Sequence, residues 1–184
     1  MEEFPEILQL VCSYLDENKI SYVVVGGVAV MYHGVPRTTV DIDFILQIEE
    51  DAIPPFVEFL ESKGFAASVE DIQTALREKS HSTLFFRDSL LRLDIQGVYS
   101  EFDRLTLERA IPVNLFGTTI MIGSAEDTFV NKILFQGEQD LRDALGIFVR
   151  NHENLDLDYI HSTSSMLEIQ DILEQFLKDS KTRE

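Results

Sequence analysis

Three aspartates are the residues of this 184-residue sequence whose types and spacing point most directly to chemistry. Asp41 and Asp43 flank Ile42 in the segment Thr38–Ile45, whose β-branched composition is typical of a strand. Successive strand side chains face opposite ways, so the two carboxylates share one face and repel each other. Such a pair can protect an exposed sheet edge, but the apolar neighbours of these aspartates indicate that the pair binds a divalent cation. Paired hard oxygen ligands suit Mg²⁺ or Mn²⁺.

Asp94 occupies the centre of the polar face of a second predicted strand. Within Leu90–Gln96 one face is formed by Leu91, Leu93 and Ile95, and the other by Arg92, Asp94 and Gln96. Three aspartates on two strands of one sheet can ligate two metal ions about 3.5–4 Å apart, an arrangement used in phosphoryl transfer. Asp94 beside Arg92 would by itself be an ordinary exposed strand residue, so this hypothesis depends on the combination.

A glycine pair, Gly26 and Gly27, lies between the β-branched run Ser21–Val25 and a helical segment that ends at Gly34. Glycine lets the backbone approach a ligand closely, and the start of the following helix presents free N–H groups to an anion. Steric needs of a tight strand-to-helix turn explain such a pair equally well when it stands alone.

Hydrophobic periodicity predicts the elements that must position these residues. The predicted helices are residues 4–17, 28–33, 53–63, 70–79, 125–136, 138–150 and 165–178. The predicted strands are residues 21–25, 38–45, 83–86, 90–98, 111–115 and 118–122. Strands and helices thus mix early and helices alone finish the chain, which indicates an α/β or α+β sheet with a helical cap. We expect a core over residues 1–123 and a helical region over 124–184, packed together as one compact unit.

Charge and composition exclude several classes of protein. Thirty-three acidic and fifteen basic residues leave a net charge of −18, which repels phosphodiester backbones and argues against general DNA binding. No apolar run reaches the length of a membrane span, and the acidic N-terminus does not resemble a signal peptide. A single cysteine, Cys12, excludes an intramolecular disulfide and a cysteine-based zinc cage. We therefore expect a cytoplasmic protein.

The segment Val25–Gly34 followed by Arg37–Asp43 resembles the signature of the polymerase-β-like nucleotidyltransferases. It is most similar to their small stand-alone branch, which includes the AbiEii-type abortive-infection toxins. That signature joins a glycine turn, a helix, a strand with paired aspartates and a third acidic residue on a later strand. The likeness covers roughly residues 20–150 and extends through Lys132 to the Asp140-x-x-Asp143 step. One departure is residues 137–139, Gly-Glu-Gln, where that branch often carries a basic stretch.

The resemblance implies a mixed-sheet nucleotidyltransferase core of four to six strands, with helices on the face opposite the aspartates and a C-terminal helical part. It also implies roles for seven residues. Those expected to bind metal and carry catalysis are Asp41, Asp43 and Asp94, and those expected to bind the nucleotide are Gly26, Gly27, Arg37 and Lys132. Thr38 and Thr39 are interpreted as strand formers. Asp140 and Asp143 lie one helical turn apart and could face the site, although an exposed acidic helix face is the default interpretation.

These expectations combine into a leading hypothesis and two alternatives. The leading hypothesis is a transferase that uses Mg²⁺ or Mn²⁺, with two ions expected, to move NMP from an NTP to an acceptor hydroxyl and release pyrophosphate. The acceptor would be a tRNA end, a protein hydroxyl or a small molecule, and the enzyme would be of the toxin type with an antitoxin-like partner. The alternatives are a non-catalytic protein of this fold that acts through a partner protein, and a metal-dependent phosphohydrolase.

Overall fold

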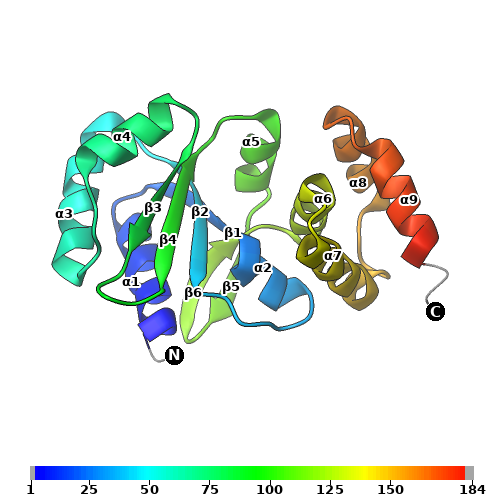
Figure 1. The fold of residues 1–184 in the computed structure, drawn as a ribbon, viewed down its shortest axis with the longest axis horizontal. Coiled ribbons are helices and arrows are strands. Elements are labelled where there is room, and N and C mark those ends of the chain that lie inside the picture. The colour runs from blue at the N-terminus through cyan, green and yellow to red at the C-terminus, as the bar shows by residue number, and fades with distance from the viewer. Residues whose placement is uncertain (1–2, 181–184) are drawn as a thin grey trace.

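A computed structural model describes residues 3–180, which form a mixed sheet with helices on both sides (Figure 1). Its helices are α1 (Glu3–Glu17), α2 (Gly26–His33), the short 3-10 helix η1 (Glu50–Ala52), α3 (Ile53–Lys63), α4 (Val69–Arg77), α5 (Glu101–Glu108), α6 (Ala125–Phe135), α7 (Glu138–Asn151), α8 (Leu157–Met166) and α9 (Gln170–Ser180). Its strands are β1 (Ser21–Val25), β2 (Asp41–Gln47), β3 (His81–Phe85), β4 (Arg92–Gly97), β5 (Ile111–Leu115) and β6 (Thr118–Ile122).

The described strands form one sheet in the order β3-β4-β2-β1-β6-β5. β1 pairs with β2, β3 with β4 and β5 with β6 in antiparallel fashion, whereas β2 with β4 and β1 with β6 are parallel. This confirms the predicted mixed sheet. The parallel pairing of β2 and β4 matters most, because it aligns the two strands that carry the predicted aspartates.

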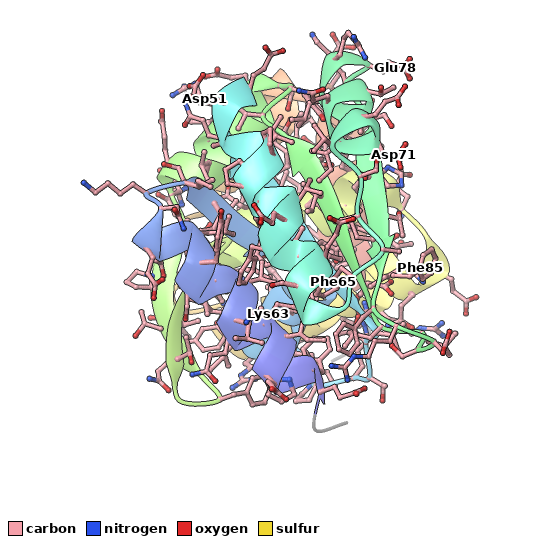
Figure 2. The ribbon with its side chains drawn as sticks, turned by 90° about the vertical axis from the view of Figure 1, so that its left-hand side faces the viewer. Asp51, Lys63, Phe65, Asp71, Glu78 and Phe85 are labelled. Atoms are coloured by element: carbon pink, nitrogen blue, oxygen red, sulfur yellow. The ribbon has the colours of Figure 1, made fainter. Side chains whose placement is uncertain are left out.

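One face of the sheet is apolar and is covered by α1, α3 and α4 (Figure 2). In β2 the side chains of Ile42, Phe44 and Leu46 alternate onto this face and are at most 2% exposed. Leu93 and Ile95 of β4 continue the same apolar layer. Because side chains alternate, the aspartates of both strands must point to the opposite face, as the sequence predicted.

The C-terminal helices α6 to α9, which lie beside the sheet in Figure 1, share a second hydrophobic cluster. Val30 of α2 and Phe102 of α5 belong to this cluster together with Phe129 and Ile147. The apolar core of the helical region therefore includes side chains that precede residue 124. This continuity supports our proposal that the core, residues 1–123, and the helical region, residues 124–184, form one compact unit.

Three local expectations were wrong in detail. The strand predicted over 38–45 begins at Asp41, because Thr39 is in an extended loop where its hydroxyl accepts the backbone N–H of Asp41. The helix predicted over 165–178 corresponds to α9, which begins only at Gln170, because Glu168 with φ 60° turns the chain between α8 and α9 and no glycine marks that turn in the sequence. Neither α5 nor α8 was predicted. None of the described helices combines the length and apolar character needed to cross a membrane.

Candidate active site

The three predicted aspartates lie together on the polar face of the sheet. Strand register places Asp43 of β2 directly opposite Asp94 of β4, and Asp94 opposite Thr83 of β3. Asp41 lies two residues before Asp43, opposite Arg92. The Thr83 hydroxyl donates a hydrogen bond to Asp94 and holds that carboxylate in place. All three carboxylates therefore lie in two neighbouring cross-strand pairs, Asp43 with Asp94 and Asp41 with Arg92.

Arg92 balances part of this negative charge. Its Nη2 lies 2.9 Å from Asp41 Oδ2, and its Nε lies 3.4 Å from Asp94 Oδ2. One guanidinium therefore bridges two of the three carboxylates. Strand alternation predicts Arg92 on this face, but no local pattern indicates that it joins Asp41 to Asp94 across the strands.

Asp43 packs against the glycine turn between β1 and α2. Gly26 has φ 59°, and a Cβ atom built on it would lie 2.0 Å from Asp43 Oδ2. The backbone N–H of Gly27 donates to the Asp43 carboxylate, and a Cβ on Gly27 would lie 2.7 Å from Thr39 Oγ1. Glycine is therefore required here to let backbone approach the carboxylate.

The environment of Asp43 disfavours its charge. Burial, followed by the neighbouring charges of Asp94 and Asp41, raises the pKa of Asp43 from 3.8 to about 6, although the Gly27 N–H and the charge of Lys132 act in the opposite direction. An ionised Asp43 is thus unfavourable in this structure, and a cation placed against it would relieve the cost.

The donor atoms fit a divalent cation. Asp41 Oδ1 is buried and has no hydrogen-bond partner among residues 3–180, so one carboxylate oxygen is available to a ligand. All three side chains offer the hard oxygens that Mg²⁺ and Mn²⁺ prefer. In the described range no group of three or more His, Cys, Asp or Glu side chains stands in a metal-binding geometry. In this structure the Arg92 guanidinium contacts two of the three carboxylates.

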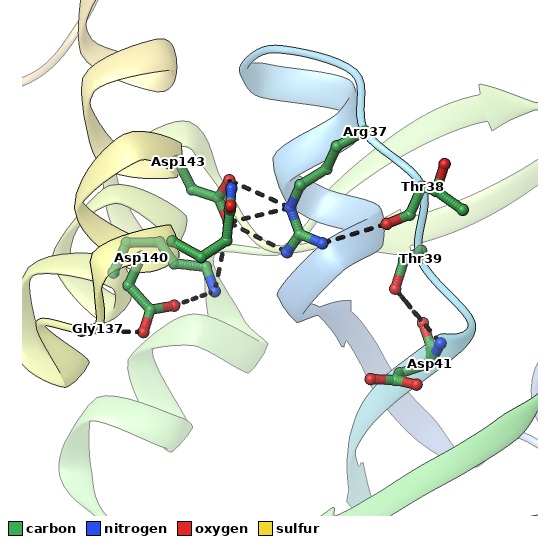
Figure 3. A network of polar contacts seen from close by, with 9 residues as sticks. Arg37, Thr38, Thr39, Asp41, Gly137, Asp140 and Asp143 are labelled. Carbon is green, nitrogen blue, oxygen red and sulfur yellow. Dashed lines mark hydrogen bonds and ion pairs between the residues drawn. The ribbon is translucent and has the colours of Figure 1, made fainter.

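The two predicted phosphate-binding cations form a separate network with α7 (Figure 3). Arg37 donates to the Asp143 carboxylate through Nε and Nη2, both at 3.1 Å. Lys132 Nζ lies 2.7 Å from Asp140 Oδ1 and 3.8 Å from Asp143 Oδ2. The expectation of an exposed acidic face was wrong for Asp143, whose side chain is 4% exposed. It is buried because α7 packs against α6 and α2, which brings it to both cations.

A cavity of about 690 Å³ collects these groups. All seven predicted site residues line it: Gly26, Gly27, Arg37, Asp41, Asp43, Asp94 and Lys132. Other residues that line it were not predicted, among them His81, Gln96, Tyr99, Asp103 and Asn131. The alternation of side chains along the strand indicates that Gln96 shares a face with Asp94. The Ser100-x-x-Asp103 capping box indicates the start of α5, and both of its residues line the cavity.

Comparison with known proteins identifies a family and a fold for this chain. Residues 2–176 match the family described as "Nucleotidyltransferase of unknown function (DUF6036)". A search of the curated proteins finds no match. The structure is similar to an antigenic nucleotidyltransferase-like protein from Paracoccidioides brasiliensis, with 16% identity, a TM-score of 0.60, and coverage of 96% of this chain and 93% of that chain.

A second similar structure is the antibiotic-resistance factor ANT(2'')-Ia in solution, with 10% identity, a TM-score of 0.58, and coverage of 97% of this chain and 95% of that chain. A crystal structure of ANT(2'')-Ia in complex with adenylyl-2''-tobramycin is similar with a TM-score of 0.51 at 10% identity, and covers 95% of this chain and 97% of that chain. At these identities the likeness concerns the fold, which is that of the nucleotidyltransferases.

Proposed function

This chain belongs to the DUF6036 family of nucleotidyltransferases, and from that premise we propose that it transfers NMP from a metal-bound NTP to an acceptor hydroxyl and releases pyrophosphate. The observation that carries the proposal is the convergence of three carboxylates, a glycine turn and two cations in one cavity. No single member of this set is specific, but phosphoryl transfer needs all three kinds of group at once.

The carboxylates would hold the cations. Asp41, Asp43 and Asp94 lie on one sheet face, where Mg²⁺ or Mn²⁺, as one or two ions, would bind their oxygens. When bound, such ions neutralise the triphosphate and polarise the transferring phosphoryl group. Asp94 would accept the proton of the acceptor hydroxyl or help to position it, because its carboxylate borders the cavity and is held by the Thr83 hydroxyl.

The other residues would position the phosphates. The first turn of α2 leaves backbone N–H groups without partners inside the helix, and Gly26 allows an anion to approach them. Arg37 and Lys132 border the same cavity and would neutralise the leaving pyrophosphate. Catalysis by such a site consists mainly of placement and charge neutralisation, since the protein itself forms no covalent bond.

Calorimetric titration of each NTP in the presence of Mg²⁺ tests the proposal. We expect heat of binding for at least one NTP with the wild type and with Asp88→Ala, an exposed aspartate outside the cavity, and a loss of this heat with Asp41→Ala. Absence of heat for every NTP with all three proteins would refute it.

Product analysis separates the alternatives. Pyrophosphate and a nucleotidylated acceptor identify the transferase, whereas orthophosphate identifies a phosphohydrolase that uses the same carboxylates. Binding without turnover identifies a non-catalytic protein of this fold. Neighbours that bind antibiotics make small hydroxyl compounds the first acceptors to test with labelled NTPs, ahead of tRNA ends and protein hydroxyls. The toxin role and the antitoxin-like partner are further proposals, tested by expression with and without neighbouring genes.

A further inference from the structure

We infer that Arg92 is a resident cation of the carboxylate site, which holds Asp41 and Asp94 together without metal and is displaced when metal binds. This inference rests on the proposed function, because it assumes that the three aspartates receive a divalent cation. It assigns to Arg92 a positioning role in which the side chain competes with the metal.

The Arg92 guanidinium contacts two of the carboxylates that are expected to bind metal. Arg92 reaches Asp41 Oδ2 at 2.9 Å and Asp94 Oδ2 at 3.4 Å, which are the carboxylates that metal would bind. A dication and a guanidinium in the same position would repel each other strongly. Metal bound by both carboxylates therefore requires the guanidinium to leave, and the guanidinium in place weakens metal binding.

The side chain can leave without disturbing the sheet. The backbone N–H of Arg92 donates to Val40 O, and the residue is paired with Asp41 on one side and Phe85 on the other. These bonds fix the backbone and leave the side chain to rotate. The Arg92 side chain is 34% exposed and Phe85 is 49% exposed, so this end of the sheet is open to solvent.

Arg92 differs in this respect from Arg37 and Lys132, two cations that line the cavity. Arg37 and Lys132 are paired with Asp143, a residue of α7 outside the three-aspartate set, so metal binding leaves their partners in place. Arg92 alone among these three shares its partners with the expected metal. Once displaced, it stays within side-chain reach of the cavity and can turn toward the phosphates that arrive with the metal.

The test measures Mn²⁺ affinity of the full chain without nucleotide, by the electron paramagnetic resonance signal of free Mn²⁺. We compare the wild type, Arg92→Gln, Arg92→Lys and Arg142→Gln. The last variant is the matched control, because Arg142 loses the same charge from an exposed ion pair with Glu138 that lies outside the cavity. Arg92→Gln should bind Mn²⁺ about tenfold more tightly than Arg142→Gln, as expected for removing one nearby charge from a partly exposed site.

A second readout follows the guanidinium itself. The Nε–H proton resonance of Arg92, identified by its absence in Arg92→Lys, should shift and exchange faster with water when diamagnetic Mg²⁺ is added to the wild type. This measurement needs no glutamine variant, so it decides the matter even if Arg92→Gln fails to fold in circular dichroism.

Three results would overturn the inference. The first is an Mn²⁺ affinity of Arg92→Gln equal to that of Arg142→Gln. The second is a weaker Mn²⁺ affinity of Arg92→Gln, which would mean that Arg92 helps to form the metal site. The third is an Nε–H resonance of Arg92 that does not change when Mg²⁺ is added. Absence of Mn²⁺ binding in every variant would overturn it as well. The proposed function fails separately, by absence of NTP binding and of pyrophosphate from the wild type, whatever the Arg92 variants do.

Discussion

Replacing Asp43 by Asn should stabilise the metal-free protein at neutral pH. Burial and two neighbouring carboxylates raise the pKa of Asp43 to about 6, so its ionised form costs stability in the folded chain. Asparagine has nearly the same shape, keeps an oxygen that can accept the Gly27 N–H, and carries no charge. The substitution therefore removes the repulsion and keeps the local hydrogen bond.

The size of the effect follows from the pKa. A rise from 3.8 to about 6 corresponds to at most about 3 kcal/mol, and we expect about 2 kcal/mol because the site retains contact with solvent. For a chain of this length that is about 4–8 °C in melting temperature. Because the folded-state pKa of this acid is raised, the penalty is absent below 3.8, develops between 3.8 and about 6, and is complete at pH 7.5.

Thermal melts in a chelator at pH 4.5 and pH 7.5 measure this difference. Asp43→Asn should melt higher than the wild type at pH 7.5, and the gap should narrow at pH 4.5. The exposed control Asp88→Asn changes the same charge and should match the wild type. Mn²⁺ should raise the wild-type melting temperature and raise that of Asp43→Asn less, because metal binds the native state through this carboxylate.

The reasoning would be refuted by an Asp43→Asn protein that is less stable in chelator and responds fully to Mn²⁺. That result would mean that Asp43 stabilises the fold through its charge, and that the metal binds elsewhere.

Two further substitutions test the surroundings of the aspartates. Asp143→Asn should lower the free energy of unfolding by about 2 kcal/mol in urea titrations, because its 4%-exposed carboxylate pairs with two cations. The control Asp140→Asn, whose side chain is 26% exposed, should lower it by less than about 1 kcal/mol. Equal losses of unfolding free energy in the two variants would contradict the network. Gly26→Ala should abolish NTP binding in calorimetry, since its Cβ atom would lie 2.0 Å from Asp43 Oδ2 at a residue with φ 59°. The control Gly117→Ala, with φ 84° and no atom within 4 Å of the added Cβ, should cost only about 1 kcal/mol of backbone strain and bind NTP normally. Normal NTP binding by Gly26→Ala would contradict the proposed role of the glycine turn.

The sequence predicted most of the sheet because its strands carry strong local signals. The run Ser21–Val25 and the alternation in Asp41–Gln47 specify buried and half-buried strands regardless of their partners. The elements that were missed lack such signals. α5 has only two buried residues, Phe102 and Thr106, so its hydrophobic pattern is faint and its capping box is the main clue.

The carboxylate site was predictable for the same reason, and its charge balance was not. Period-two alternation is enough to place Asp41 and Asp43 on one face, and it places Asp94 on a polar face of its own strand. The partners of Arg37 and Lys132, in contrast, come from α7, and no local pattern indicates which helix packs where. Long-range packing decides whether an acidic helix residue is solvated or buried, as it does for Asp143.

Among the three predicted aspartates, only Asp43 has no ion pair within residues 3–180. Asp41 and Asp94 are bridged by Arg92, and Asp143 is paired with Arg37 and Lys132, whereas Lys132 affects Asp43 only through its charge at longer range. The cost of ionisation is thereby concentrated on the carboxylate that lies against the glycine turn. In the function proposed above, a cation that arrives with a triphosphate would gain most by binding at that position, because there it would relieve a repulsion as well as form new contacts. Our proposal therefore places metal and nucleotide at the junction of β1, α2 and β2.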